Sequence, residues 1–270
     1  MEIFRPGVCA SAAILVAVTL LAVPYAQGED SDVLIERALK LSGLSGQIKM
    51  LDRMLLSSIP ADAFPDLNTR NKAAKFLKQV MDEDTLLNMV QTSLKDDCKG
   101  DLLKKVLDFY NSKLGNKVGR LQSTALEPSL LRNIREGRKT FAALDDRRMM
   151  VLKRIIHAEG VTEDNAKSLR SFIRGLIDGF SDETDNRAER MRITLKAIEN
   201  TASIAENRTE EIAMLAFAHT FQTLSDKDLD ELAHFQESEA AAWFRSAVRK
   251  GVTKAVYETA KALGKAMHKP

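Results

Sequence analysis

The sequence predicts an all-α protein: two tandem, diverged helical units packed into an elongated multi-helix bundle and preceded by a signal peptide. Apolar residues recur every three or four positions along most of the chain, and no run alternates polar and apolar residues as a half-buried strand does. Six prolines fall mostly outside these periodic stretches. A chain of 270 residues is long enough to bury a sizeable core as one or two domains.

Residues 1–28 are predicted to be a signal peptide. Arg5 gives a weakly positive start, residues 10–23 are apolar, and Ala26 and Gly28 are the small residues that precede a cleavage site. We expect cleavage after Gly28, with Ala26 as the alternative, and export to the periplasm or beyond. Retention as an inner-membrane anchor stays open, because the segment carries no charge after Arg5.

The first unit is predicted to cover residues 29–140 and the second residues 141–270, with the boundary in the weakly patterned stretch near Thr140. No long Pro/Gly/Ser-rich linker separates them, so we expect the units to pack together. In the first unit the pattern predicts helices at 32–42, 48–56, 69–80 and 83–94, two helices joined by a corner within 100–121, a loop at 59–66 and a kink or restart at Pro128. In the second it predicts helices at 147–159, 162–180, 188–198, 212–221 (capped by Thr209), 225–235 and 238–267.

The stretch from Leu224 to Val256 reads as two helices joined by a tight corner. Ser225 is a predicted N-cap with Asp228 in the position of a capping-box acid, and Ser238 is predicted to cap the second helix. The second helix has one apolar stripe: Ala240, Trp243, Phe244, Ala247, Val248, Gly251 and Val252.

The same corner occurs earlier in the chain. Phe109 and Ser112 repeat the spacing of Phe235 and Ser238 at an offset of 126 residues (235 − 109). The Gly-Leu-Ser starting at Gly43 and the Gly-Val-Thr starting at Gly160 both predict a helix-ending glycine followed by a hydroxyl cap, at an offset of 117 (160 − 43). We interpret these as two copies of one helical unit, with nine extra residues in the second; the alternative is a chance likeness of amphipathic helices.

Phe109, Tyr110, Ser112 and Gly115 form a corner motif that resembles the signature of the bacterial Domain of Unknown Function 2059 family. The opening motif Leu39, Ser42, Gly43 and Leu44 resembles that family as well. The resemblance implies an exported, all-helical bacterial protein and transfers no catalytic residue. The second copy departs from the motif, with Gln236 in place of the tyrosine and Ala241 in place of the glycine, so a binding role for the tyrosine rests on Tyr110 alone.

Two groups of residues are candidates for weak ligand or partner binding. Tyr110, Trp243 and Phe244 are aromatic anchors that line a groove in one interpretation and pack in the core in the other. Arg245 and Arg249, with Lys250 and Lys254, form a cationic strip that either meets anionic lipid headgroups or is a solvated face. We assign a structural role at the two corners to Phe109, Ser112, Gly115, Phe235 and Ser238.

Catalytic, metal and cofactor sites are not predicted. None of the four histidines stands three or four residues from another histidine or a cysteine, which is the spacing of a helical metal pair. His219 and His234 are the imidazoles that an enzyme would use, each with a structural alternative. Cys98, alone after cleavage of residues 1–28, is interpreted as a small packing residue, with an intermolecular disulfide as the alternative.

The charge composition narrows the range of expected partners. The net charge is +2, and charges of both signs are interspersed, which argues against nucleic acid as the main partner. We expect a non-catalytic exported protein that binds a protein or envelope component. The alternative is a carrier of a lipid or other apolar ligand held between the two units, and a hydrolase ranks below both. The oligomeric state and the partner are left open.

Overall fold

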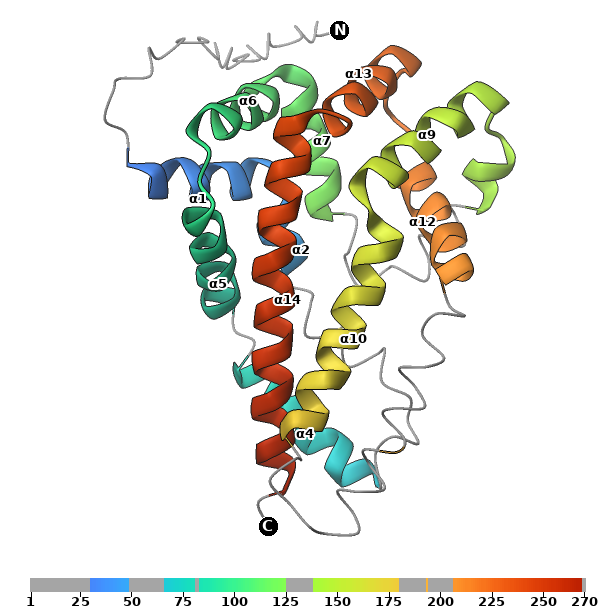
Figure 1. Ribbon diagram of the computed structural model, residues 1–270. Helices are drawn as coiled ribbons and strands as arrows, with labels where there is room; N and C mark the ends of the chain where they lie inside the picture. The colour runs from blue at the N-terminus through green and yellow to red at the C-terminus, as the bar shows by residue number, and fades with distance from the viewer. Residues whose placement is uncertain are drawn as a thin grey trace, which may run out of the picture.

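The computed structural model describes residues 30–48, 66–80, 83–124, 138–179, 193 and 206–268, and within them it is all-helical (Figure 1). The helices are α1 (Ser31–Leu41), α2 (Leu44–Ile48), α4 (Leu67–Val80), α5 (Glu83–Asp96), α6 (Gly100–Asn111), α7 (Lys113–Thr124), α9 (Asp146–Glu159), α10 (Val161–Gly179), α12 (Glu206–Thr220), α13 (Asp226–Gln236) and α14 (Glu239–His268).

The predicted all-α class is confirmed, and most predicted helices lie within two residues of an observed one. Thr209 was wrongly predicted as an N-cap, because α12 begins at Glu206 and its first turn is polar. Gly43 and Gly160 do end helices, with φ angles of +77° and +63°. The next helices begin immediately after them, so Ser45 and Thr162 are the second helical residues and not caps. Several predictions fall outside the described residues: residues 1–29, residues 49–56 of the predicted helix at 48–56, all but Asp66 of the loop at 59–66, Pro128, and the stripe at 188–198 apart from Ile193.

Helix α14 is 30 residues long and runs along the molecule from the α13 corner toward the C-terminus (Figure 1). It packs against α5 on one side and against α10 on another. Small residues allow the close approach: a Cβ added at Gly251 would lie 2.7 Å from the Val90 Cα in α5. At the same crossing the Ser93 hydroxyl donates to the Ala247 carbonyl at 3.0 Å.

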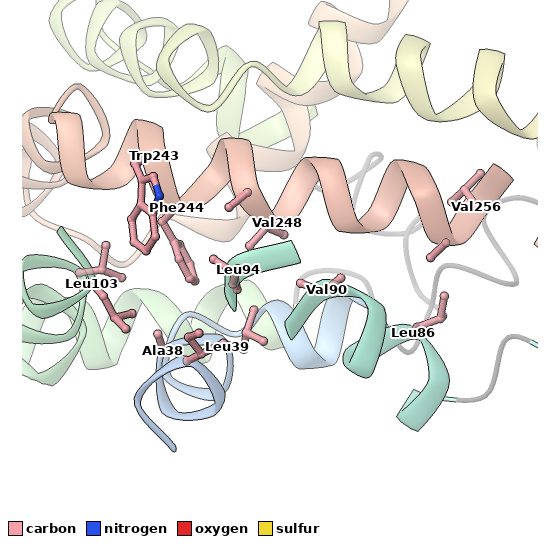
Figure 2. Close-up of a cluster of buried hydrophobic side chains, with 14 of the residues drawn as sticks. Ala38, Leu39, Leu86, Val90, Leu94, Leu103, Trp243, Phe244, Val248 and Val256 are labelled. Atoms are coloured by element: carbon pink, nitrogen blue, oxygen red, sulfur yellow. The ribbon is translucent and has the colours of Figure 1, made fainter. Parts of the chain in front are cut away.

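The larger apolar core surrounds α14. Trp243, Phe244 and Val248 face side chains of α1, α5 and α6 (Figure 2). The Trp243 indole N–H donates to the Asp97 carbonyl at 2.9 Å, so its polar atom is satisfied although the ring is buried. The facing apolar stripes of α5, α10 and α14 are in direct contact, so this part of the described structure is a packed core. A carrier that held its ligand between the two units would need a hollow here.

A second apolar core lies between α7, α9, α12 and α13. It takes Leu114 and Val118 from the predicted first unit, and most of its other residues from the second. The core around α14 likewise mixes residues from before and after residue 140. Phe109 packs against both cores. The two predicted units are therefore packed into each other, while their origin as a duplication remains an interpretation.

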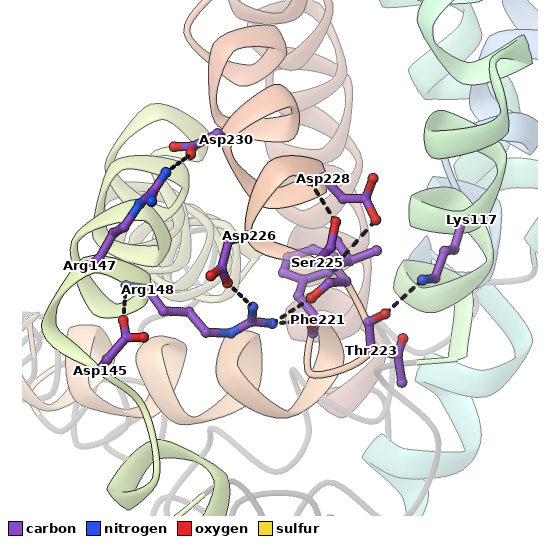
Figure 3. A network of polar contacts seen from close by, with 11 residues as sticks. Lys117, Asp145, Arg147, Arg148, Phe221, Thr223, Ser225, Asp226, Asp228 and Asp230 are labelled. Carbon is purple, nitrogen blue, oxygen red and sulfur yellow. Dashed lines mark hydrogen bonds and ion pairs between the residues drawn. The ribbon is translucent and has the colours of Figure 1, made fainter.

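Polar contacts hold the turn between α12 and α13 (Figure 3). Arg148 of α9 donates to Asp226 at 2.6 Å and to the carbonyls of Phe221 and Leu224 at 3.1 and 2.9 Å. Its side chain is only 16% exposed, so these charge-assisted bonds are shielded from water. Lys117 of α7 donates to the Thr223 carbonyl at 2.7 Å, which ties the first corner's helix to the same turn.

The caps at this turn follow the predicted chemistry. The Ser225 hydroxyl accepts from the Asp228 N–H at 3.2 Å, and the Asp228 carboxylate accepts from the Ser225 N–H at 3.3 Å, which is a complete capping box. Asp145 caps α9 by accepting from the Arg148 N–H at 2.7 Å. None of the helices in the described part of the chain is long and apolar enough to cross a membrane.

Candidate functional site

The first corner joins α6 to α7 at Ser112. The Ser112 N–H donates to the Phe109 carbonyl at 2.9 Å, and the Ser112 hydroxyl accepts from the Gly115 N–H at 3.0 Å. Gly115 fits here because an added Cβ would overlap the Phe109 carbonyl oxygen. The glycine therefore lets α7 fold back closely against the end of α6.

The second corner joins α13 to α14 at Ser238 and repeats these bonds 126 residues later (238 − 112). The Ser238 N–H donates to the Phe235 carbonyl at 3.0 Å, and the Ser238 hydroxyl accepts from the Ala241 N–H at 3.2 Å. The predicted capping role of Ser238 is confirmed. Ala241 stands where the first corner has Gly115, and α13 and α14 contact each other less extensively than α6 and α7 do.

The two corners pack on each other through their aromatic residues. The rings of Phe109 and Phe235 are stacked, with centroids 3.6 Å apart and planes at 5°. Tyr110 places its ring edge-on to both, at 5.2 Å from Phe109 and 5.6 Å from Phe235. The sequence pointed to each corner separately, and the structure brings them together into one contact.

A polar group lies beside this aromatic contact. Arg245 donates to the Gln236 side-chain oxygen at 2.5 Å and to the Gln236 backbone carbonyl at 2.8 Å. The Gln236 amide donates to a carboxylate oxygen of Glu159 at 3.0 Å, and Gln122 reaches the same oxygen at 3.4 Å. We call Tyr110, Gln122, Glu159, Gln236 and Arg245 the corner cluster; it draws on α6, α7, α9, α13 and α14.

Burial dominates the electrostatics of the corner cluster. It raises the pKa of Glu159 from 4.5 to about 7, although the positive charge of Arg245 opposes the shift. It also raises the pKa of Tyr110, and the negative charge of Glu159 adds to that effect. Tyr110 therefore stays neutral at any physiological pH, whereas Glu159 changes its charge near neutrality.

The predicted cationic strip is not a uniform surface feature. Arg245 and Arg249 are half-buried, while Lys250 and Lys254 are exposed. Arg245 points to Gln236, and Arg249 lies against the end of α9, since a Cβ added at Gly160 would be 3.0 Å from an Arg249 guanidinium nitrogen. The expectation of one exposed strip fails because the corner turns α14 so that this face starts against α9 and α13.

The predicted aromatic anchors are inside the molecule. Tyr110, Trp243 and Phe244 are 5%, 6% and 3% exposed and belong to the larger core. A partner could reach them only after the core opened. Their helical spacing matches core packing, which was the alternative interpretation of the same pattern.

An open hollow of about 470 Å³ lies between α9, α12 and the short helical segment at 138–142. Its apolar lining is Phe141, Met149, Met214 and Leu215, and its charged lining is Arg138, Lys153, Glu210 and Glu211. Sequence reasoning missed this site, because its lining comes from three segments whose packing no local pattern reveals.

The remaining candidates do not join these sites. His219 is half-buried and lies 3.5 Å from the Gln222 amide, and exposed His234 lies between Arg154 and Glu237. Cys98 is exposed, so its interpretation as a packing residue was wrong; it follows α5, where the chain turns at the surface. Over the described residues no group of three potential ligands for a metal ion is found.

Comparisons with protein-family models, with curated proteins and with solved structures find no match to this chain. The resemblance to the Domain of Unknown Function 2059 family therefore stays a prediction from the two motifs.

Proposed function

We propose that the protein is a non-catalytic binding protein exported to the bacterial periplasm, where it binds a protein or envelope partner. The predicted signal peptide supports export, and the motif resemblance supports the bacterial envelope. The hollow between α9 and α12 is the observation that carries the binding role.

The hollow has the size and lining of a recognition site. Its volume of about 470 Å³ lies within the usual range of roughly 300–1,000 Å³ for ligand-binding pockets. Two methionines in its lining are adaptable apolar contacts, which is typical of surfaces that accept varied partner segments.

Charges of both signs at the hollow favour a partner segment over a bulk membrane surface. Arg138 and Lys153 face a partner's acids, while Glu210 and Glu211 repel anionic lipid. The imidazoles do not line this hollow, so its residues offer binding contacts without an evident acid–base pair.

Site-specific photocrosslinking tests the binding role. We expect a photoreactive residue at position 153 to give a discrete crosslinked species in the periplasm of the expressing bacterium, and the same residue at exposed Lys105 on α6 to give none. The crosslink should disappear when Glu211→Arg is added, since this change reverses a rim charge at an exposed position. Equal labelling at both positions would count against a site in the hollow.

A small-ligand carrier is the second candidate, because the same hollow is large enough for an amphipathic molecule of modest size. Native mass spectrometry of the exported chain distinguishes the two. A bound small molecule that is lost in Met149→Trp, with helicity unchanged by circular dichroism, favours the carrier. A bare protein mass leaves the partner-binding role in front.

A further inference from the structure

We propose that Glu159 is a proton-sensitive latch that joins the end of α9 to the corner between α13 and α14. The proposal rests on the corner cluster and is independent of the hollow and of any partner.

The position of Glu159 disfavours its negative charge. It is the last residue of α9, directly before Gly160 in the left-handed conformation. The C-terminal end of a helix carries the negative end of the dipole, so a carboxylate there is destabilised. Burial in the corner cluster acts in the same direction.

The contacts of Glu159 cross between elements that are distant in the sequence. Its carboxylate oxygen accepts from Gln236 of α13 at 3.0 Å and from Gln122 of α7 at 3.4 Å. Arg245 occupies both the side-chain and the backbone oxygen of Gln236. With its amide oxygen held by Arg245, Gln236 must turn its NH₂ group toward Glu159, so the three residues form one directed chain of hydrogen bonds.

Among the described side chains, few charged or titratable groups lie near Glu159. From α14 they are Arg245 and Arg249, whose guanidinium group lies close to Gly160. From α6 the group is Tyr110, which stays neutral. α7 and α13 present the neutral amides of Gln122 and Gln236.

The other neighbours of α9 lie farther along it. Glu210 and Glu211 of α12 line the hollow, next to Met149 and Lys153 of α9. Both of these α9 residues lie six or more positions before Glu159. On α9 itself, His157 is exposed. At the start of α10, the side chains of residues 162–166 lie outside the described residues.

The direction of the pH effect follows from the raised pKa. The folded protein holds the Glu159 proton up to a pH of about 7, whereas the unfolded chain releases it near 4.5. The folded state therefore binds more protons between these values, and its stability falls as pH rises from about 4.5 through 7. Near neutral pH the half-buried carboxyl of Glu159 therefore changes from its protonated to its ionised form, and the junction loses stability.

Native-state hydrogen exchange on the exported chain tests the latch. After correction for intrinsic exchange rates, we expect the opening equilibrium of the α13–α14 corner to rise by roughly tenfold or more between pH 5.5 and pH 8.5. Glu159→Gln should remove this rise, because the amide keeps the shape and cannot ionise. Glu237→Gln is the matched control on the same corner and should retain it, since Glu237 is exposed and its hydrogen bond to Arg154 lowers its pKa.

A direct titration of the unmodified protein tests the proposal even if the Glu159→Gln variant fails to fold. The ¹³C chemical shift of the Glu159 carboxyl in the unmodified protein should titrate near pH 7. A midpoint near 4.5, or an opening equilibrium that is flat with pH in the unmodified protein, would overturn the proposal. A rise that persists in Glu159→Gln would overturn it as well.

Discussion

The two helix corners of this protein share a phenylalanine, a serine and the hydrogen bonds that these residues make, while their other side chains differ. In both, a serine N–H donates to a phenylalanine carbonyl, and the serine hydroxyl accepts from the N–H three residues on. The first corner has Tyr110 and Gly115, whereas the second has Gln236 and Ala241. The shared phenylalanine and serine set the turn, and the differences at the tyrosine and glycine positions change the contacts that each corner makes.

The difference at the small residue governs how the helices leave the corner. Gly115 lets α7 fold back on α6, while α14 leaves α13 and continues for 30 residues past α5 and α10. The difference between Tyr110 and Gln236 gives the two corners different roles where they pack on each other. Tyr110 supplies a buried aromatic edge, and Gln236 links Arg245 to Glu159.

Exchanging the small residues should give the largest effect. Gly115→Ala places a Cβ against the Phe109 carbonyl, and we expect it to lower the free energy of unfolding by about 3 kcal/mol. Ala241→Gly introduces no clash and should cost only about 1 kcal/mol, through the greater flexibility of glycine in a helix. Urea unfolding followed by circular dichroism measures both. Equal costs would show that the first corner does not need its glycine.

Changing the polar residues should separate their roles. Gln236→Leu leaves Arg245 and Glu159 without their shared partner, and we expect a loss of about 2 kcal/mol, as for hydrogen bonds to charged groups. Tyr110→Phe keeps the aromatic edge and removes only the hydroxyl, so about 1 kcal/mol should be lost. A larger loss for Tyr110→Phe than for Gln236→Leu would mean that the hydroxyl, rather than the amide, organises the cluster.

Removing the caps should give a small effect that is equal at both corners. Ser112→Ala and Ser238→Ala each delete one side-chain bond to a helix N–H, which typically costs about 1 kcal/mol. Thermal unfolding of the two variants under the same conditions makes the comparison. If only one variant loses stability, the caps do not play the same role at the two corners.

Most of the fold could be predicted from short-range sequence features such as helix caps and helix-ending glycines. The capping box at Ser225, the cap at Ser238 and the glycines at 43 and 160 are short-range features, and the sequence displays them directly. Thr209 shows the limit of this reasoning. A hydroxyl before an apolar run predicts a cap, but polar residues of good helix propensity extended α12 three residues earlier.

The candidate site depended on contacts that no local pattern contains. In the sequence Gln236 is notable only as a departure from the first corner, and Glu159 is only the last residue of a predicted helix. Their interaction depends on how α9 packs against α13, across 77 residues of chain. The partial burial of Arg245 could not be predicted for the same reason. Helical periodicity shows which face of the helix a residue occupies, but it does not show which element covers that face.

A double-mutant cycle between Phe109 and Phe235 measures directly whether the two corners stabilise each other by packing together. Phe109→Leu and Phe235→Leu each remove one ring from the stacked pair while keeping apolar bulk. We expect a coupling energy of about 1 kcal/mol, because the second substitution should cost less once the first ring is gone. A coupling energy indistinguishable from zero, with both single variants folded, would contradict it.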